Sequence, residues 1–303
     1  MRTLTYDDGL LVCGDNLEWM CQQPDNSIDL TFGSPPYENA RTYGIDFDLT
    51  GQDWVDWMME RWIEMHRITK GLVAMVIEGT QEDYEWSATA ILLAAGLKRK
   101  GYKLRKPVLH ERPGIPGSQT PDFLRNLYEF IIVTSKGKLP WSDPTVTGKP
   151  SKDDYISKED RQRINDLMAT EKITQRDAVR KLGIAFRVDK IGRTKDGTEY
   201  EVPYVPPERA NPGNIVHCTG YMGSDKASAN EAAFPEKLAD FFVRSFCPKD
   251  GVVLDPFNGG GTTVSTARKR RRRFVGVDIR DSQIDLTVTR LEEAAYRRGF
   301  DLE

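Results

Sequence analysis

The chain has 303 residues, and its 43 Lys and Arg against 46 Asp and Glu give a formal net charge of −3. Apolar residues make up 39% of the sequence, and a chain of this length buries a real core as one large domain or two small ones. This composition excludes a wholly disordered chain and a polybasic protein that binds nucleic acid through bulk charge. It leaves nucleic acid open as a partner, because a local basic patch is enough.

Cysteine and histidine usage argues against a metal centre. The four cysteines, at positions 13, 21, 218 and 247, show no CxxC spacing, and the chain has only three histidines. We therefore expect no metal and no disulfide framework. Residues 1–8 lack the apolar core of a signal peptide, and the longest apolar stretch, about 90–97, is far shorter than a membrane span. We expect a cytoplasmic protein with reduced thiols and no membrane contact.

Residues 1–148 read as alternating strands and helices. Apolar runs predict strands over 10–13, 27–33, 72–77 and 129–134, and helical spacing predicts helices over 16–22, 53–67 and 84–95. The tryptophans of the second helix are interpreted as packing residues, with base stacking as the alternative. Strands that alternate with helices indicate an α/β fold with a largely parallel sheet.

Residues 149–209 differ in composition, since they are polar and contain few large apolar residues. They predict helices over 158–168 and 174–182 and a turn within 192–197. Residues 173–184 resemble half of a helix-turn-helix unit, with Thr174 as N-cap, Ala178 at the helix crossing and Gly183 at the turn. We predict a mainly helical insertion; the likeness to a DNA-binding unit favours a nucleic-acid contact, and an insertion for stability or dimerisation is the alternative.

Residues 210–303 return to the α/β pattern. They predict helices over 234–246 and from 262 to about 271, and strands over 251–254 and 273–277. A last helix follows Asp278 and ends at about residue 298. Residues 1–148 and 210–303 are therefore assigned to one domain, which the segment 149–209 interrupts.

A glycine-rich turn follows the strand over 251–254. The sequence Asp255-Pro256-Phe257-Asn258-Gly259-Gly260-Gly261-Thr262-Thr263 combines glycines, which let a backbone approach a ligand, with the free N–H groups of a helix start. Asp278 ends the next strand, where an acid can accept hydrogen bonds from ribose. The turn lacks a phosphate-loop Lys and carries an acid, so it favours a nucleoside with a cationic end. S-adenosylmethionine fits, because Asp255 can meet its ammonium; a turn without a ligand is the alternative.

A second turn, Ser34-Pro35-Pro36-Tyr37, directly follows a predicted strand. The prolines fix the backbone and leave rigid carbonyl acceptors, which suit an exocyclic NH₂ group. Tyr37 offers a face on which a planar base can stack, as in enzymes that take a base out of a duplex. The alternative is a strand end with a tyrosine in the core.

Together these turns resemble those of the amino-group DNA methyltransferases, which methylate N6 of adenine or N4 of cytosine. The Phe234-Pro235 pair before a helix and Gly14-Asp15 after the first strand match two further family motifs. The turn over 34–37 matches the family's catalytic motif (the catalytic turn), and the glycine-rich turn over 255–263 matches its cofactor motif (the cofactor turn). The catalytic turn comes first in the chain, as in the family's β arrangement. This order implies a circularly permuted, Rossmann-like fold in which the strand before Gly14 lies beside the strand that ends at Asp278. Both loops would then meet at one sheet edge.

The resemblance implies an enzyme that uses S-adenosylmethionine, flips a DNA base and methylates its exocyclic amine. It also implies that the insertion over 149–209, between the two motif blocks, recognises the DNA target. Ser34 and the Pro35 carbonyl would hold the amine in nucleophilic geometry. Ser rather than Asp at position 34 favours cytosine N4 over adenine N6, which stays open. The implied catalytic residues are Ser34, Pro35, Pro36 and Tyr37. The implied cofactor contacts are Asp15, Phe234, Pro235, Asp255, Phe257, Asn258, Gly259, Gly261, Thr262, Thr263 and Asp278.

Basic segments offer candidate phosphate contacts. One runs over residues 98–112, is expected beside the catalytic pocket, and has a solvated surface strand as its alternative interpretation; another lies in the insertion. The predicted DNA contacts are Lys98, Lys100, Lys103, Arg105, Arg112, Arg125, Arg176, Arg180 and Lys181. A third basic run, residues 268–273, reads either as a solvated helix end or as a phosphate clamp.

Two other functions remain as alternatives. Enzymes that methylate RNA or a protein glutamine also use Pro-Pro-Tyr turns, but their cofactor turn usually comes first. A catalytically dead DNA-binding regulator is disfavoured by the intact motifs. A homodimer and a cognate restriction endonuclease are left open as partners of a restriction–modification enzyme.

Overall fold

The computed structural model describes residues 1–38, 47–82, 84–112, 124, 126–150, 156–184, 187–194, 197–204, 209–218 and 234–300. The chain divides into two compact units, one formed by Met1–Pro144 with Gly213–Glu303 and the other by Thr145–Pro212. Each unit is described by itself.

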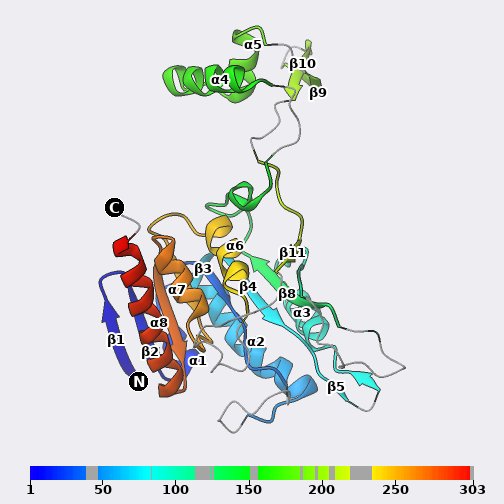
Figure 1. Cartoon of the computed structure of the whole chain (residues 1–303). Helices are drawn as coiled ribbons and strands as arrows, with labels where there is room; N and C mark the ends of the chain where they lie inside the picture. The colour runs from blue at the N-terminus through cyan, green and yellow to red at the C-terminus, as the bar shows by residue number, and fades with distance from the viewer. Residues whose placement is uncertain are drawn as a thin grey trace. The chain divides into compact units, whose positions relative to one another are not determined.

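The larger unit is built on a nine-stranded sheet in the order β1-β2-β13-β12-β3-β4-β8-β7-β11 (Figure 1). The strands are β1 (Arg2–Tyr6), β2 (Gly9–Cys13), β3 (Ile28–Gly33), β4 (Thr69–Ile77), β7 (Val108–Glu111), β8 (Tyr128–Ser135), β11 (Ile215–His217), β12 (Val252–Asp255) and β13 (Arg273–Asp278). The five central strands from β2 to β4 are parallel, whereas β8 runs antiparallel to both of its neighbours. The predicted pairing of β2 with β13 is confirmed.

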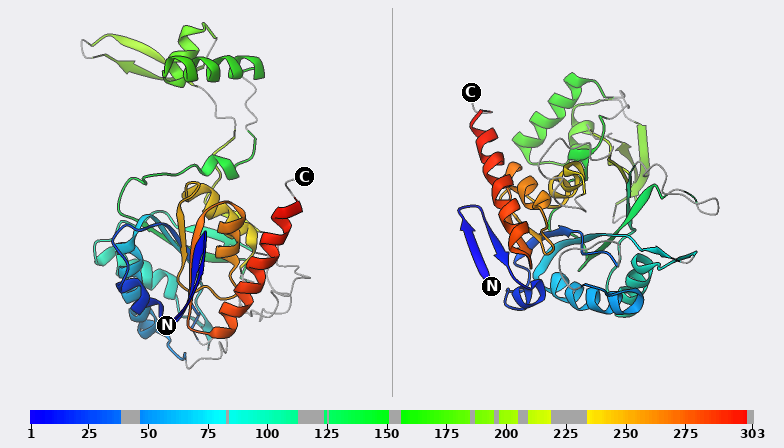
Figure 2. Two further views of the ribbon diagram at one scale, coloured as in Figure 1. Left: turned by 90° about the vertical axis from the view of Figure 1, so that its left-hand side faces the viewer. Right: turned by 60° about the horizontal axis from the view of Figure 1, so that its bottom comes forward.

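Helices cover both faces of this sheet, as Figure 2 shows. One face carries α1 (Asn16–Cys21), α2 (Gly51–Ile68) and α3 (Thr89–Arg99), and the other carries α6 (Glu236–Phe246), α7 (Thr262–Lys269) and α8 (Asp281–Phe300). Trp54 and Trp62 of α2 are fully buried, which confirms their packing role, and Phe32 of β3 stacks on Phe242 of α6 at 4.5 Å between ring centres. These layers are the predicted Rossmann-like fold.

The helix predicted over 84–95 begins later than expected. A small hairpin of β5 (Gln81–Glu82) and β6 (Glu85–Trp86) comes first, and α3 starts only at Thr89. Trp86 is drawn into this hairpin because its indole donates to Glu78 Oε1 at 3.2 Å and its ring stacks on Phe130. Tertiary contacts here override local helix propensity. The short strands β1 and β11 were also missed.

The smaller unit contains α4 (Lys158–Glu171), α5 (Gln175–Lys181) and a hairpin of β9 (Arg187–Arg193) and β10 (Glu199–Tyr204); η1 (Pro144–Thr147) spans its start. The hairpin is a feature that the polar sequence did not reveal. Thr174 caps α5 as predicted, with its hydroxyl accepting from Asp177 N at 3.3 Å. Ala178 is buried in a four-residue core, and Gly183 adopts a φ of +64° at the turn.

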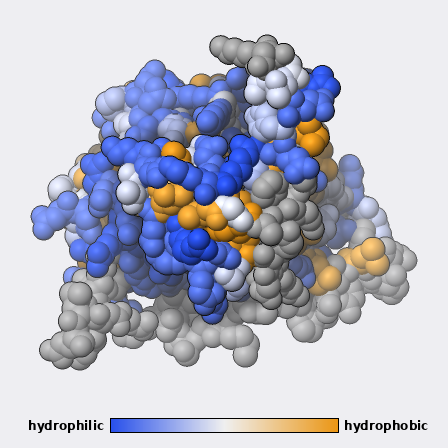
Figure 3. Space-filling view, turned by 90° about the horizontal axis from the view of Figure 1, so that it is seen from above, coloured by the Kyte–Doolittle hydropathy of each residue, from blue (hydrophilic) through white to orange (hydrophobic). Residues whose placement is uncertain are grey.

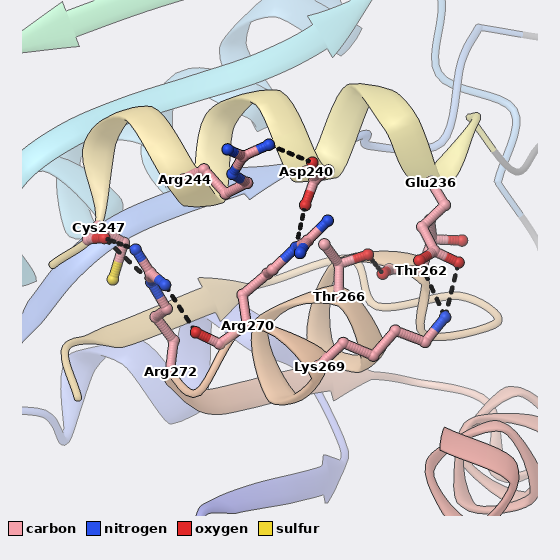
Figure 4. A network of polar contacts seen from close by, with 9 residues as sticks. All are labelled: Glu236, Asp240, Arg244, Cys247, Thr262, Thr266, Lys269, Arg270 and Arg272. Atoms are coloured by element: carbon pink, nitrogen blue, oxygen red, sulfur yellow. Dashed lines mark hydrogen bonds and ion pairs between the residues drawn. The ribbon is translucent and has the colours of Figure 1, made fainter. Parts of the chain in front are cut away.

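The basic run over 268–273 is engaged within the protein (Figure 4). Lys269 bonds both carboxylate oxygens of Glu236 at 2.8 and 2.9 Å, and Arg270 bonds Asp240 at 2.5 Å. Arg272 donates to the Cys247 carbonyl at 2.9 and 3.1 Å and is buried, with its pKa lowered by that burial. These contacts tie α7 to α6, so the run stabilises the fold instead of forming an open phosphate clamp.

Hydrophilic side chains cover most of the face drawn in Figure 3. In the part of the chain that the structure describes, no helix has the length and hydrophobicity needed to cross a membrane.

Candidate active site

Both predicted turns line a single pocket of about 350 Å³. It lies at the carboxyl ends of β2, β3, β12 and β13, where parallel α/β sheets bind ligands. Of the residues predicted from the sequence, the pocket is lined by Asp15, Ser34, Pro35, Pro36, Phe234, Asp255, Phe257, Asn258, Gly259, Thr262 and Asp278. Tyr37, Pro235, Gly261 and Thr263 lie next to lining residues in the chain but do not line the pocket themselves.

The glycine-rich turn is held open by Asp278 and by α8. Asp278 Oδ2 accepts from Gly259 N at 2.7 Å, and Asn258 Nδ2 donates to Thr287 Oγ1 of α8 at 2.8 Å. Gly261 adopts a φ of +76°, and a Cβ there would lie 2.5 Å from Thr287 Cγ2. Glycine is therefore required at position 261 by both backbone conformation and space.

Asp255 is the acid that the sequence placed at the cationic end of the ligand. It lines the pocket yet is only 2% exposed, and its Oδ1 accepts from Phe257 N at 3.1 Å. Burial raises the pKa of Asp255 to about 7, and the nearby charge of Asp278 acts in the same direction. An entering cation would stabilise the ionised form. A Cβ at Gly33 would lie only 2.3 Å from Asp255 Oδ1, so glycine there makes room for this carboxylate.

A basic and aromatic wall of the pocket was missed from the sequence. Arg61 of α2 is 8% exposed, pairs with Asp15 Oδ2 at 3.3 Å and lies 4.1 Å from the centre of the Trp57 ring. Trp57 in turn packs between Phe47 and Phe257, at 4.9 and 5.8 Å between ring centres. Helical periodicity identified the buried side of α2, but it could not show that Trp57 and Arg61 continue that side into a pocket.

The catalytic turn is anchored on three sides. Ser34 Oγ donates to the Val76 carbonyl at 3.1 Å, and the Trp54 indole donates to the Pro36 carbonyl at 2.9 Å. Glu38, which is 1% exposed, accepts from the backbone N–H of Gly51 at the start of α2. It also accepts from the hydroxyls of Ser87 and Thr89 at the start of α3. These bonds fix the turn on rigid elements, as precise positioning requires.

Two carboxylates, one buried and one half-buried, lie near this turn, and no sequence pattern pointed to either of them. Glu129 of β8 accepts from the Tyr37 hydroxyl at 3.3 Å. Glu78 follows β4; burial raises its pKa to about 7, and its Oε2 is buried without a hydrogen-bond partner among the described residues. Strand ends carry polar residues for many reasons, so only the pairing of β4 with β8 reveals this cluster.

The candidate DNA contacts are spread over several places. Contrary to the expectation from sequence, Lys100 and Lys103 line a second hollow with Ser135, which pairs with Leu72 near the start of β4, away from the catalytic turn. The Arg105 guanidinium also bonds Ser135, at 3.0 Å. The basic segment over 98–112 extends beyond this hollow in both directions. Lys98 is near the end of α3, whereas Arg112, after β7, lies on the side of the catalytic turn. Arg125 lies outside the described residues.

In the smaller unit, all three predicted DNA contacts belong to α5. Arg180 lies 4.9 Å from the centre of the Tyr200 ring, Lys181 bonds Glu171 at 2.7 Å, and Arg176 also lies on this helix. Arg180 and Lys181 therefore already have partners within the unit.

The pocket fits S-adenosylmethionine. Its volume is in the range of small-molecule sites, it has aromatic walls for a purine, and it has acids for a cationic centre and a ribose. Within the described residues, no three His, Cys, Asp or Glu side chains gather in a way that could hold a metal ion.

Comparisons with known proteins agree with this geometry. Residues 28–289 match the family model for N6 and N4 methyltransferases, described as DNA methylase. The orphan methyltransferase M.BamHII of Bacillus amyloliquefaciens is 26% identical over 88% of this chain and 90% of its own length. The type II methyltransferase M.ScaI of Streptomyces caespitosus is 27% identical over 95% of this chain and 83% of its own.

This chain is similar both to a protein named for adenine methylation and to one named for cytosine-N4 methylation. The DNA adenine methyltransferase YhdJ of Escherichia coli is 22% identical over 96% of this chain and 85% of its own length. The structure of the cytosine-N4-specific PvuII DNA methyltransferase superposes with a TM-score of 0.64 at 18% identity, over 94% of this chain and 87% of that one. The family match covers most of the chain and includes both turns of the pocket. The chain is therefore a member of the N6/N4 DNA methylase family, an enzyme that uses S-adenosylmethionine to methylate an exocyclic amine of DNA.

Proposed function

We propose that this enzyme methylates N4 of cytosine at a specific DNA sequence, on a base taken out of the duplex. The observation that carries the proposal is that Ser34, Pro35 and Pro36 line the same pocket as Asp255 and Asp278. A base amine held by the catalytic turn would thus face the reactive end of the cofactor. The Ser at position 34, where Asp is the other common choice, favours cytosine over adenine.

In the proposed mechanism the protein acts mainly through position and electrostatics. Bound S-adenosylmethionine supplies an electrophilic methyl group. The Pro35 carbonyl accepts a hydrogen bond from the target amine, and Ser34 holds the amine so that its lone pair points at the pocket. Tyr37 stacks on the base. Glu78, whose pKa burial raises to about 7, is protonated in about half of the molecules at pH 7 and in that form offers its carboxyl group to the polar edge of the base.

The cofactor contacts are assigned by the same logic. Asp278 and Asp15 hold the ribose and the adenine, and Asp255 meets the ammonium group. Thr262 and the aromatic rings of Phe234 and Phe257 complete the binding surface. The remaining members of this proposed set act through the backbone of their turns: Pro235, Asn258, Gly259, Gly261 and Thr263.

We assign target recognition to residues 149–209, with Arg176, Arg180 and Lys181 of α5 on the DNA backbone. Arg112 is assigned a phosphate contact beside the catalytic turn. Lys98, Lys100, Lys103 and Arg105 are proposed for flanking DNA only, because they are placed away from that turn. This division predicts DNA binding that weakens markedly with salt. The type II name of M.ScaI supports the further proposal that a restriction endonuclease shares the target sequence.

Nucleoside mass spectrometry tests the choice of base. The full chain is incubated with S-adenosylmethionine and unmethylated plasmid DNA, which is then digested to nucleosides. We expect N4-methylcytosine to accumulate. N6-methyladenine in its place would overturn the cytosine assignment. It would leave the family membership intact, because the relative YhdJ is named as a DNA adenine methyltransferase.

Cofactor binding should weaken in acid. With a pKa of about 7, Asp255 is half ionised at pH 7, and roughly 3% ionised at pH 5.5. If the ionised carboxylate meets the ammonium group, the Kd for S-adenosylmethionine rises by on the order of tenfold between these pH values. Isothermal titration calorimetry measures this. Asp255→Asn should bind weakly and without that slope; an equal slope in both proteins would contradict the assignment.

A further inference from the structure

The hydroxyl of Tyr37 has a hydrogen-bond partner on a strand that is paired on both sides. Glu129 Oε1 accepts from it at 3.3 Å, although the two residues are 92 positions apart in the sequence. Glu129 belongs to β8, which is held between β4 and β7 by antiparallel pairing on both sides. The sheet therefore fixes the backbone that carries this carboxylate.

Two further donors hold the same carboxylate. His110 Nδ1 lies 2.9 Å from Glu129 Oε2, and Arg112 Nη1 lies 3.2 Å from Oε1. Burial alone raises the pKa of Glu129, but the bond from His110 and the charge of Arg112 outweigh it, so the pKa lies below its usual value. An ionised carboxylate only accepts hydrogen bonds, so His110 Nδ1 carries a proton.

Burying the polar side chains of Glu129 and His110 would cost free energy if they only filled space in the core. Glu129 and His110 are 6% and 2% exposed, and His110 Nε2 is buried without a hydrogen-bond partner among the described residues. Apolar residues of similar size would avoid these desolvation costs. The cluster does provide a fixed, charged acceptor at the one polar atom of the Tyr37 side chain.

We infer that Glu129 is a positioning residue for Tyr37: held by His110 and Arg112, it fixes the orientation of the Tyr37 ring as the platform for the target base. The inference rests on the proposed function, in which Tyr37 stacks on that base. Glu129 acts through Tyr37 and not on the substrate. Loss of the carboxylate should therefore matter only while the Tyr37 hydroxyl is present.

A double-mutant cycle tests this on the full chain, with plasmid DNA and S-adenosylmethionine. Tyr37→Phe and Glu129→Gln should each lower kcat by roughly tenfold, the worth of one hydrogen bond to a charged group, and leave the Kd for S-adenosylmethionine within twofold. The double variant should lose no more than the worse single variant. A loss near 100-fold, the product of the two, would overturn the inference.

Asp29→Asn provides the matched control. Asp29 is a carboxylate at the other end of β3, where it accepts from Val252 N at 2.9 Å and pairs with Lys70 at 3.0 Å. Its effect on kcat should multiply with that of Tyr37→Phe. If Glu129→Gln fails to fold, His110→Gln replaces it in the same cycle. Wild-type protein is assayed first, because absence of methyl transfer there would refute the proposed function and not the cycle.

A second readout needs neither DNA nor turnover. Fluorine NMR of protein labelled with fluorotyrosine identifies the Tyr37 signal as the one missing in Tyr37→Phe. Glu129→Gln should shift or broaden this signal, whereas Asp29→Asn should leave it in place. An unchanged Tyr37 signal in Glu129→Gln would show that the carboxylate does not hold the ring.

Discussion

Replacing Tyr37 with alanine is expected to lower the rate of methyl transfer by at least about 100-fold, because base–aromatic stacking and the orientation of the base are lost together. Binding of S-adenosylmethionine should stay within about twofold, since Tyr37 does not line the cofactor pocket. Rates are measured with labelled cofactor and plasmid DNA, and affinity is measured by calorimetry.

Tyr37→Phe is the matched variant, because it keeps the ring and removes only the hydroxyl that reaches Glu129. It should retain on the order of a tenth of the activity. If Tyr37→Ala loses cofactor binding together with turnover, Tyr37 supports the fold of the pocket and does not serve as a platform for the base.

Replacing Asp278 with alanine should weaken S-adenosylmethionine binding by roughly 100-fold, equivalent to about 3 kcal/mol for charged hydrogen bonds. Two contributions add here. The carboxylate would accept from the ribose, and its Oδ2 also accepts from Gly259 N, which holds the glycine-rich turn in its open shape. Isothermal titration calorimetry with the full chain measures the change in Kd.

Asp285→Ala is the control for this prediction. Asp285 lies in α8, and its side chain is 68% exposed and pairs with Arg2 at the surface. Its replacement should change the Kd by less than about twofold, as for most exposed ion pairs. An Asp278→Ala variant that binds as tightly as wild type would remove Asp278 from the cofactor site.

Much of the larger unit could be predicted because its signals are local. The strands over β2, β3, β4 and β8 are apolar runs, and the two motif turns directly follow strands. The resemblance to the family's β arrangement then implied that β2 and β13 are neighbours, and the structure pairs them. These steps depend on short stretches in which the residue types strongly restrict the local backbone.

The parts that could not be predicted depend on contacts between distant segments. Trp86 begins no helix, because Glu78 and Phe130 hold it in a hairpin. Arg61 lines the pocket because its side chain reaches Asp15, just after β2, and periodicity does not reveal this contact. Glu129 carries no local signal, and its role follows from strand pairing.

Runs of basic residues in the sequence were also hard to interpret, because their positions and partners depend on distant segments. The sequence grouped Lys98 to Arg112 into one basic segment, but the chain turns after α3, so its first part and Arg112 lie towards opposite ends of β8. The run over 268–273 looked available for phosphate, yet acids and carbonyls of α6 and its neighbouring loops bind most of it. Net charge and charge runs indicate available cations only after their partners within the protein are known.

The two turns should act as one active site that transfers a methyl group to DNA. A competition assay tests this by giving the full chain S-adenosylmethionine with an isotopically labelled methyl group, together with DNA, RNA and bulk protein in one reaction. We expect label in the DNA alone, at a base amine, and none with Tyr37→Ala. Label in RNA or protein, or no label in DNA under any salt or pH condition, would contradict a DNA methyltransferase built from these two turns.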